Sequence, residues 1–346
     1  MVNCYIFKDH FIEHLEALKR IDSSEMYRVY DKWPQIGERQ FGADFELIED
    51  FNPEHIVFAG MGGSGAISDL FSSILSKTGV HVDVVKGYLL PKTADSDSLV
   101  ICTSISGNTV ETLSVLEKAQ KNRCKIMAFS DGGQMQQICT AKNIPFRQIP
   151  ALHSPRASFT SFLYSMLKVL SPVLPISESD VIESLDKMKQ TQKKICSDND
   201  SDNPALELAS WLPEIPVIYY PWGLESAAIR FKNSLQENSK MHVIAEDVIE
   251  SCHNGIVSWK KSSQIKPILL RGQEDYTKTQ ERWDILKDFF NHEGIEYKEI
   301  FSLSGSILAK LINLIYLFDY TSIYKAVLAE IDPTPVNAIN FVKDRL

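Results

Sequence analysis

Apolar runs typical of buried strands alternate with runs typical of helices along most of this chain, and this alternation limits the folds that it can adopt. In the first half, strands are expected at residues 55–60, 81–86, 98–103, 125–130 and 146–149, and helices at 66–76, 109–121 and 134–142. Strands separated by helices pair in parallel, and the helices cover both faces of the sheet. We therefore predict a first α/β unit over residues 51–155.

The same order of elements returns after a polar stretch, SDNDSDNP (197–204). Strands are expected at 216–220, 241–245, 265–270 and 296–301, and helices at 224–235, 276–292 and 304–330. Two further helices, at 157–170 and 177–195, precede the polar stretch. Polar joints between patterned halves are typical of domain boundaries. We predict an N-terminal helical segment (1–50) that packs on the body, a first unit (51–155), linking helices (156–203) and a second unit (204–346).

Composition and charge exclude several classes of protein. The net charge of −9 argues against binding to the nucleic-acid backbone. The longest apolar segment contains Lys310, Asp319 and Lys325, which favours a buried helix over a membrane span. The six cysteines form no C-x-x-C pair, and the N-terminus does not resemble a secretory signal. The pattern of cysteines favours reduced thiols in a cytoplasm over a disulfide framework or a zinc site built from cysteines.

A glycine-rich loop, GMGGSG (60–65), follows the first expected strand and matches G-x-G-x-x-G. A dinucleotide site also requires an acidic residue about 20 positions later, where the second strand ends, to bind the ribose. Lys86 occupies that end, and Asp83 lies in the middle of the strand. The spacing of three glycines is therefore weak support for an NAD-dependent dehydrogenase.

A second loop, SISGNT (104–109), supplies hydroxyl groups at another turn from strand to helix. The unpaired backbone N–H groups at a helix N-terminus attract anions, and hydroxyls add donors to them. We predict that one phosphate monoester binds at both loops, through Gly63, Ser64, Ser104, Ser106 and Thr109. Helix capping by Ser106 and Thr109 is the simpler alternative, but it leaves the other hydroxyls unexplained.

Three motifs, GMGGSG, SISGNTVETL and DGGQM, resemble a sugar isomerase (SIS) domain. The chain from about residue 50 onward also resembles the bifunctional phosphoglucose/phosphomannose isomerase family, in the motifs SPRASF (154–159), QENSK (236–240), CHNGIVSW (252–259), DYTSIY (319–324) and DPTPVNAI (332–339). The resemblance implies two SIS-type α/β/α sandwich subdomains, each with a mostly parallel sheet flanked by helices. It also implies isomerisation of hexose 6-phosphates through a cis-enediol, with glucose 6-phosphate and fructose 6-phosphate as substrates, mannose 6-phosphate as a further candidate, and no metal or organic cofactor.

The resemblance also assigns roles to individual residues. It implies that Glu237 is the base that moves a proton between C1 and C2, and that Arg156 stabilises the enediolate. It implies as well that His253 opens the sugar ring and reaches the site from the neighbouring subunit of a homodimer. It further implies that Thr334 allows the mannose epimer to be used and that Lys343, on the last helix, contacts the substrate. The local sequence also makes Thr334 the N-cap of a helix that begins at a proline.

The chain departs from the family pattern at several positions. Ile105 replaces an aromatic residue in the hydroxyl loop, Gln236 replaces an asparagine, and Asp131 stands where a serine is common. Cys252 and Gly255 flank His253-Asn254 where the family has an asparagine and a glutamate. These departures leave open a second interpretation, a non-catalytic protein that senses sugar phosphates.

Overall fold

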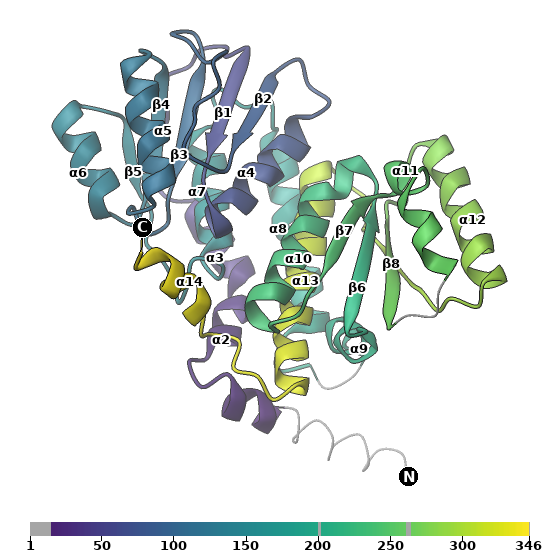
Figure 1. Cartoon of the computed structure of the whole chain (residues 1–346). Helices are drawn as coiled ribbons and strands as arrows, with labels where there is room; N and C mark the ends of the chain where they lie inside the picture. Colours follow the sequence, from purple (N-terminus) through teal and green to yellow (C-terminus); the bar gives the residue numbers. More distant parts are fainter. Residues whose placement is uncertain (1–14, 200–201, 261–263, 346) are drawn as a thin grey trace. The chain divides into compact units, whose positions relative to one another are not determined.

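The computed structural model describes residues 15–199, 202–260 and 264–345, and the chain divides into two compact units (Figure 1). The first-sheet unit comprises residues 32–186 and 306–309, and the second-sheet unit comprises the remainder. Of the N-terminal segment, residues 1–14 lie outside the described residues. Its described part contains α2 (Met26–Asp31), in the second-sheet unit, and α3 (Trp33–Phe41), in the first-sheet unit.

The first-sheet unit contains a five-stranded parallel sheet in the order β2-β1-β3-β4-β5. Its strands are β1 (His55–Ala59), β2 (His81–Val85), β3 (Leu99–Thr103), β4 (Lys125–Ser130) and β5 (Phe146–Gln148). Its helices include α4 (Gly62–Leu75), α5 (Val110–Lys121), α6 (Gly133–Lys142) and α7 (Phe159–Val169). Helix α8 (Glu178–Ile195) begins in this unit and continues into the other.

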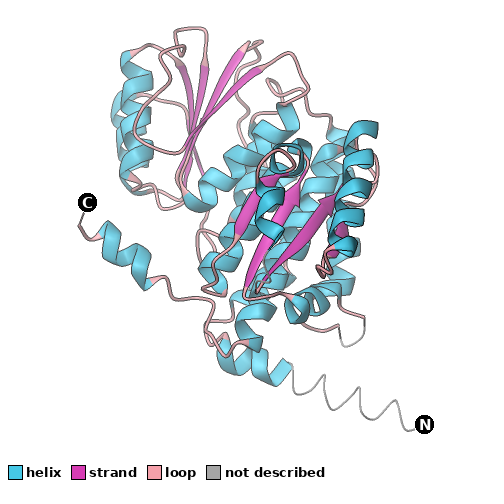
Figure 2. Cartoon of the chain, turned by 45° about the vertical axis from the view of Figure 1, so that its right-hand side comes forward, coloured by secondary structure: helices cyan, strands magenta, loops and turns pink. Residues whose placement is uncertain are grey.

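Alternate residues of β1 supply the cores on the two faces of this sheet. Val57 and Ala59 join the cluster formed with α5 and α6, whereas Phe58 faces the other way and stacks on Phe71 of α4 with ring centroids 5.0 Å apart. Successive strand residues point to opposite faces, so a strand that is apolar throughout must be covered on both sides. Figure 2 shows helices on both faces of the sheet.

The second-sheet unit contains a four-stranded parallel sheet in the order β7-β6-β8-β9. Its strands are β6 (Ile215–Tyr220), β7 (Ile244–Asp247), β8 (Ile265–Arg271) and β9 (Lys298–Phe301). Its helices are α9 (Pro204–Trp211), η1 (Trp222–Leu224), α10 (Glu225–Asn238), α11 (Val248–Ser251), η2 (Gly255–Lys260), α12 (Thr277–His292), α13 (Ile307–Leu328, whose first turn belongs to the other unit) and α14 (Asn337–Lys343).

These two sheets confirm the predicted α/β class, although some boundaries differ from the predictions. Helix α4 begins at Gly62, inside the glycine loop, rather than at residue 66. Helix α9 was not predicted because its first residue belongs to the polar joint, where Asn203 caps it by accepting the N–H groups of Ala205 and Leu206. No helix of the described residues combines the length and apolarity needed to cross a bilayer.

A buried row of polar side chains joins α10 to α13 in the second-sheet unit. Arg230, Ser234 and Asn238 are spaced by four residues and so lie on one face of α10. The Arg230 guanidinium binds the Asp319 carboxylate, with Nε 3.1 Å from Oδ1 and Nη2 2.6 Å from Oδ2, and the hydroxyl of Ser234 donates to the same carboxylate. Asn238 donates to the hydroxyl of Ser322 at 2.8 Å. These bonds fix the rotation of α10 up to its last turn.

The loops that follow β3 and β4 interlock through three glycines. Gly107 has φ +70°, and a Cβ there would lie 1.9 Å from the carbonyl oxygen of Gly132. Gly133 has φ +68°, and a Cβ there would lie 2.5 Å from the carbonyl oxygen of Ser106. The Gly107 carbonyl accepts the N–H of Met135 at 2.8 Å. Side chains at these positions would push the two loops apart.

We predict that Gly107→Ala lowers the free energy of unfolding by about 2–4 kcal/mol, because it combines a left-handed backbone with overpacking against Gly132. Urea denaturation measures the change. Gly79→Ala is the matched control, since a Cβ there meets no atom within 4 Å, and its effect should stay within about 0.5 kcal/mol. Equal effects of the two substitutions would contradict the interlocked geometry.

We predict that Asp319→Leu destabilises the protein by about 3–5 kcal/mol, because it leaves the Arg230 guanidinium buried without its partner. Burial by itself lowers the pKa of Arg230, but the Asp319 carboxylate outweighs that effect and holds the pKa above its usual value. The guanidinium therefore stays charged. The double variant Arg230→Met/Asp319→Leu should recover much of the loss in the same denaturation measurement. A double variant that loses as much as the sum of the singles would refute the coupling.

Candidate active site

The glycine loop and the hydroxyl loop follow neighbouring strands of the first sheet, β1 and β3. The chain passes from β1 to β2 on one side and continues from β3 to β4 on the other, so the sheet order reverses between β1 and β3. Ligands of open α/β sheets bind outside the carboxyl ends of the strands at such a reversal. A hydrogen bond from the Ile105 N–H to the Ser64 hydroxyl, 3.3 Å long, joins the two loops there.

The hydroxyl groups of the second loop do not act as simple helix caps. Thr109 occupies the N-cap position of α5, but its hydroxyl accepts no N–H of the helix. It lies 2.8 Å from the hydroxyl of Ser104 instead. Ser106 is exposed and accepts the N–H of Asn108 at 3.3 Å. The capping interpretation therefore does not explain Thr109, and the start of α5 keeps backbone donors for a ligand.

Gly63 and Arg156 are brought to the same edge of the sheet. A Cβ on Gly63 would lie 2.9 Å from the carbonyl oxygen of Pro155 and 3.4 Å from the Arg156 nitrogen, so only glycine permits this approach. Arg156 is buried, in a turn braced by the hydroxyl of Ser158, which donates to the Ser154 carbonyl at 2.8 Å. The structure thus gathers all the predicted phosphate-binding residues and Arg156 in one unit.

The end of β2 does not offer a ribose-binding carboxylate. The side chain of Lys86 reaches over the glycine loop, with its Cε 3.4 Å from the position of a Cβ on Gly65. Its ammonium group binds the Asp69 carboxylate of α4. A dinucleotide would therefore meet a lysine where its ribose hydroxyls need an acceptor.

In the second-sheet unit, Glu237 lies in the last turn of α10 and is partly buried. The next two residues are fully buried and anchored to α13: Asn238 donates to the Ser322 hydroxyl, and the Ser239 hydroxyl donates to the Ser322 carbonyl at 2.7 Å. These anchors restrict where the Glu237 side chain can point.

Lys240 connects the end of α10 to the C-terminal DPTP segment (332–335). Its ammonium group donates to the carbonyl of Glu237, to that of Pro333 at 3.3 Å and to that of Pro335 at 2.9 Å. The backbone of Thr334 is thereby held beside the end of the helix that carries Glu237. Sequence reasoning did not single out Lys240, because a lysine after a helix is usually solvated.

The prediction that Thr334 caps the last helix is wrong. Helix α14 begins at Asn337 with Val336 in the N-cap position. The Thr334 N–H donates to the side chain of Asp332 at 2.9 Å, and Lys240 holds the carbonyls on either side of Thr334, so this segment forms a bend ahead of the helix. Lys343 is exposed at the end of α14, beyond the segment that Lys240 holds.

His253 is exposed in the turn that follows α11. Two carboxylates flank this turn: Glu250 accepts a hydrogen bond from Asn254 at 2.8 Å, and a Cβ on Gly255 would lie 2.7 Å from Oε2 of Glu246. Glu246, near the end of β7, therefore lies against Gly255, a contact that only the fold reveals.

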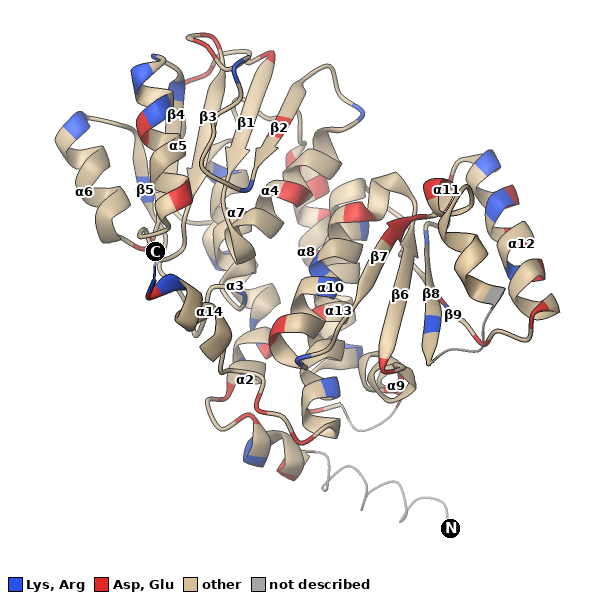
Figure 3. Ribbon diagram, viewed as in Figure 1, with Lys and Arg blue, Asp and Glu red and all other residues tan. Residues whose placement is uncertain are grey.

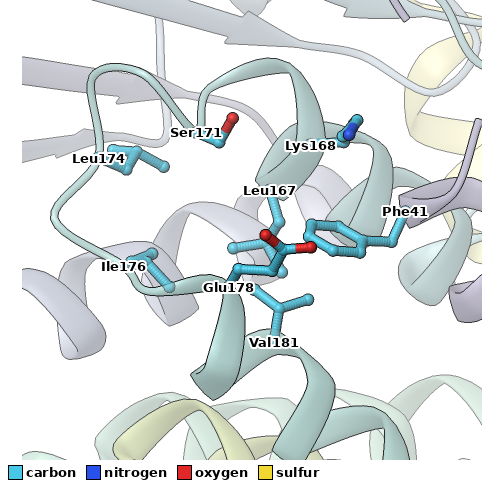
Figure 4. A pocket seen from close by; sticks show the side chains of 8 residues that line it. All are labelled: Phe41, Leu167, Lys168, Ser171, Leu174, Ile176, Glu178 and Val181. Carbon is cyan, nitrogen blue, oxygen red and sulfur yellow. The ribbon is translucent and has the colours of Figure 1, made fainter. Parts of the chain in front are cut away.

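Two hollows in the first-sheet unit lie away from the strand ends that carry the loops. The first, about 80 Å³, is lined by Phe41, Leu167, Lys168, Ser171, Leu174, Ile176, Glu178 and Val181 (Figure 4). It is much smaller than the ~300 Å³ at which small-molecule pockets begin. The second, about 500 Å³, lies at the amino ends of the strands, beside His55, Ser98 and Lys125. Neither hollow contains a predicted site residue.

Comparisons with known proteins identify the domains and the fold. Residues 51–171 match the SIS domain, and residues 201–346 match the bacterial phospho-glucose isomerase C-terminal SIS domain. Among solved structures, the chain is similar to a hypothetical protein of Thermus thermophilus (TM-score 0.73, 14% identity, 98% of this chain and 95% of the other). It is also similar to the tagatose-6-phosphate ketose/aldose isomerase of Escherichia coli (TM-score 0.63, 15% identity, 95% of each chain).

Two curated relatives cover most of the chain. The bifunctional phosphoglucose/phosphomannose isomerase of Caldicellulosiruptor bescii is 32% identical over 85% of this chain and 89% of its own length. The protein of the same name from Aquifex aeolicus is 29% identical over 87% of this chain and 93% of its own length. This chain belongs to the bifunctional phosphoglucose/phosphomannose isomerase family.

Proposed function

We propose that this chain interconverts glucose 6-phosphate and fructose 6-phosphate, with mannose 6-phosphate as a further substrate. The observation that carries the proposal is the cluster of hydroxyls and glycines where the order of the first sheet reverses, in a chain of this family. Such a cluster suits one compact phosphate group, and the sugar attached to it is then available for chemistry.

The phosphate is held by neutral donors in this proposal. Ser64, Ser104, Ser106 and Thr109 offer hydroxyls, and Gly63 offers a backbone N–H at the start of α4. Ser64 and Ser104 are almost fully buried, so their positions are set before the ligand arrives. The positive ends of α4 and α5 add to the attraction of the anion.

The isomerisation itself is a proton transfer between neighbouring carbons. The Glu237 carboxylate takes the proton from C2 of the open-chain aldose, the cis-enediol forms, and the same group returns a proton to C1. The hydroxyl proton of C2 passes to the oxygen on C1. Arg156 stabilises the negative charge that develops on these oxygens. Lys343 contacts the sugar, and Thr334 allows the mannose epimer to be used. Mannose 6-phosphate forms when the proton returns to C2 from the opposite face.

Ring opening needs a second acid–base group, which is His253 in this proposal. Its imidazole takes the proton of the anomeric hydroxyl and delivers a proton to the ring oxygen. Its exposure supports the idea that it acts on the substrate of a second subunit, in a homodimer. We also propose a cytoplasmic location, which is supported by five free cysteines among the described residues.

We predict that Glu237→Gln lowers kcat by about 10²–10⁴-fold, because an amide cannot accept the proton from C2. A coupled assay with fructose 6-phosphate, and a parallel assay with mannose 6-phosphate, measures turnover. Glu214→Gln, which changes an exposed glutamate of the same unit, should leave turnover unchanged. Near-normal turnover in Glu237→Gln would refute the mechanism, and wild-type protein that binds sugar phosphate without turnover would be a sensor instead.

We predict that Ser104→Ala raises KM for fructose 6-phosphate by about tenfold, because a hydrogen bond to a charged phosphate is worth about 1.5 kcal/mol or more. The value of kcat should change less, since the phosphate is bound equally before and during the reaction. Ser114→Ala is the control, because that hydroxyl lies on α5 and donates to the Val110 carbonyl. An unchanged KM in Ser104→Ala would show that the phosphate does not bind at Ser104.

A further inference from the structure

Two histidines and an aspartate meet at the amino ends of β1 and β2, the edge of the first sheet opposite the phosphate loops. The register pairs His55 of β1 directly with His81 of β2. Asp83 is two residues beyond His81, so its side chain projects from the same face of the sheet. Parallel pairing therefore brings together three side chains that belong to two separate parts of the sequence.

The distances between the three groups suit a small cation. Nε2 of His55 is 2.9 Å and Nε2 of His81 is 3.6 Å from Oδ2 of Asp83, and all three groups offer ligand atoms within 4.8 Å of one another. Ligands at ~2.0–2.1 Å from a tetrahedral Zn²⁺ are about 3.3 Å apart. The three ligand atoms therefore need to move only slightly closer together to bind a zinc ion. The His81 side chain is 66% exposed, so it can rotate toward the other two groups.

An outer hydrogen-bond network orients His55 for this role. Its Nδ1 lies 3.1 Å from the hydroxyl of Ser98, and that hydroxyl donates to the Asp95 carboxylate at 3.0 Å. In histidines that bind a metal, the ring nitrogen that does not contact the metal usually makes a hydrogen bond of this kind. That hydrogen bond fixes the orientation of the ring and its tautomer. The His55 side chain is mostly buried, so its Nε2 is held toward Asp83.

The surroundings favour a cation over an anion. The hollow of about 500 Å³ beside His55 is also lined by Glu54, Asp95 and Asp97. Figure 3 shows acidic segments in the loops at this edge of the sheet. The basic residue of the hollow, Lys125, lies over the ring of Phe51 at 3.7 Å.

We propose that His55, His81 and Asp83 bind one divalent cation of the zinc class, with water completing its coordination. Two imidazoles and one carboxylate form a donor set that zinc accepts, whereas calcium and magnesium prefer oxygen ligands. Because β2 is an edge strand of the sheet, the cation would fasten it to β1. The site is separate from the proposed isomerase chemistry and does not depend on it.

The test uses the full-length chain with any purification tag removed and bound metal stripped by a chelator. Calorimetric titration with Zn²⁺ should show one site per chain, and Co²⁺ should give visible absorption of a nitrogen–oxygen site without a thiolate charge-transfer band. Zn²⁺ should also raise the melting temperature, since it binds only the folded sheet.

The variants His81→Asn and Asp83→Asn should each weaken Zn²⁺ binding at least about tenfold, since even outer partners of a metal ligand change affinity by ~10–100-fold. Both side chains are partly or largely exposed, so the fold should persist, as circular dichroism checks. His292→Asn is the matched control: it removes an exposed histidine 3.9 Å from a single carboxylate, that of Glu293. Unchanged affinity in His81→Asn, an equal loss in His292→Asn, or no saturable binding to the wild type would each overturn the proposal.

Discussion

The buried ion pair between Arg230 and Asp319 is the interaction on which the geometry of the second-sheet unit depends. Both groups are removed from water, which costs several kcal/mol per charge unless their hydrogen bonds are well made. The helices α10 and α13 must therefore keep the one rotation in which Arg230 and Ser234 meet Asp319. The same row continues to Asn238, next to Glu237, so a structural pair far from solvent determines where the proposed base emerges.

The first-sheet unit depends on a different constraint, the close approach of backbones that only glycine permits. Gly107 touches the loop after β4, and Gly63 touches the turn that carries Arg156. Backbone packed this tightly leaves N–H groups and small hydroxyls as the donors that face a ligand. That chemistry suits a single phosphate and requires no charged side chain in the loops, which agrees with the acidic net charge of the chain.

The fold was largely predictable because both sheets are parallel and buried. Their strands are nearly continuous apolar runs bounded by polar turns, and the predicted strand at 125–130 agrees with β4 residue for residue. Elements whose ends depend on hydrogen bonds between distant residues were predicted less well. Thr334 has the local pattern of an N-cap, yet Lys240, more than 90 positions away, holds the backbone around it in a bend outside the helix. The hydrogen bonds of Lys240 thus outweigh the local preference of Thr334 for a helix N-cap.

The sequence by itself determined the class of fold, the family, and the presence of the glycine loop and the hydroxyl loop. These features depend on short-range patterns of polarity and on residues adjacent in the chain. Only the tertiary structure decided which distant groups become neighbours. It placed Glu246 beside Gly255, Lys240 against the DPTP segment, and His55 opposite His81. The physical reason is that strand register and helix rotation are set by burial of the whole core, and no local pattern of residues encodes them.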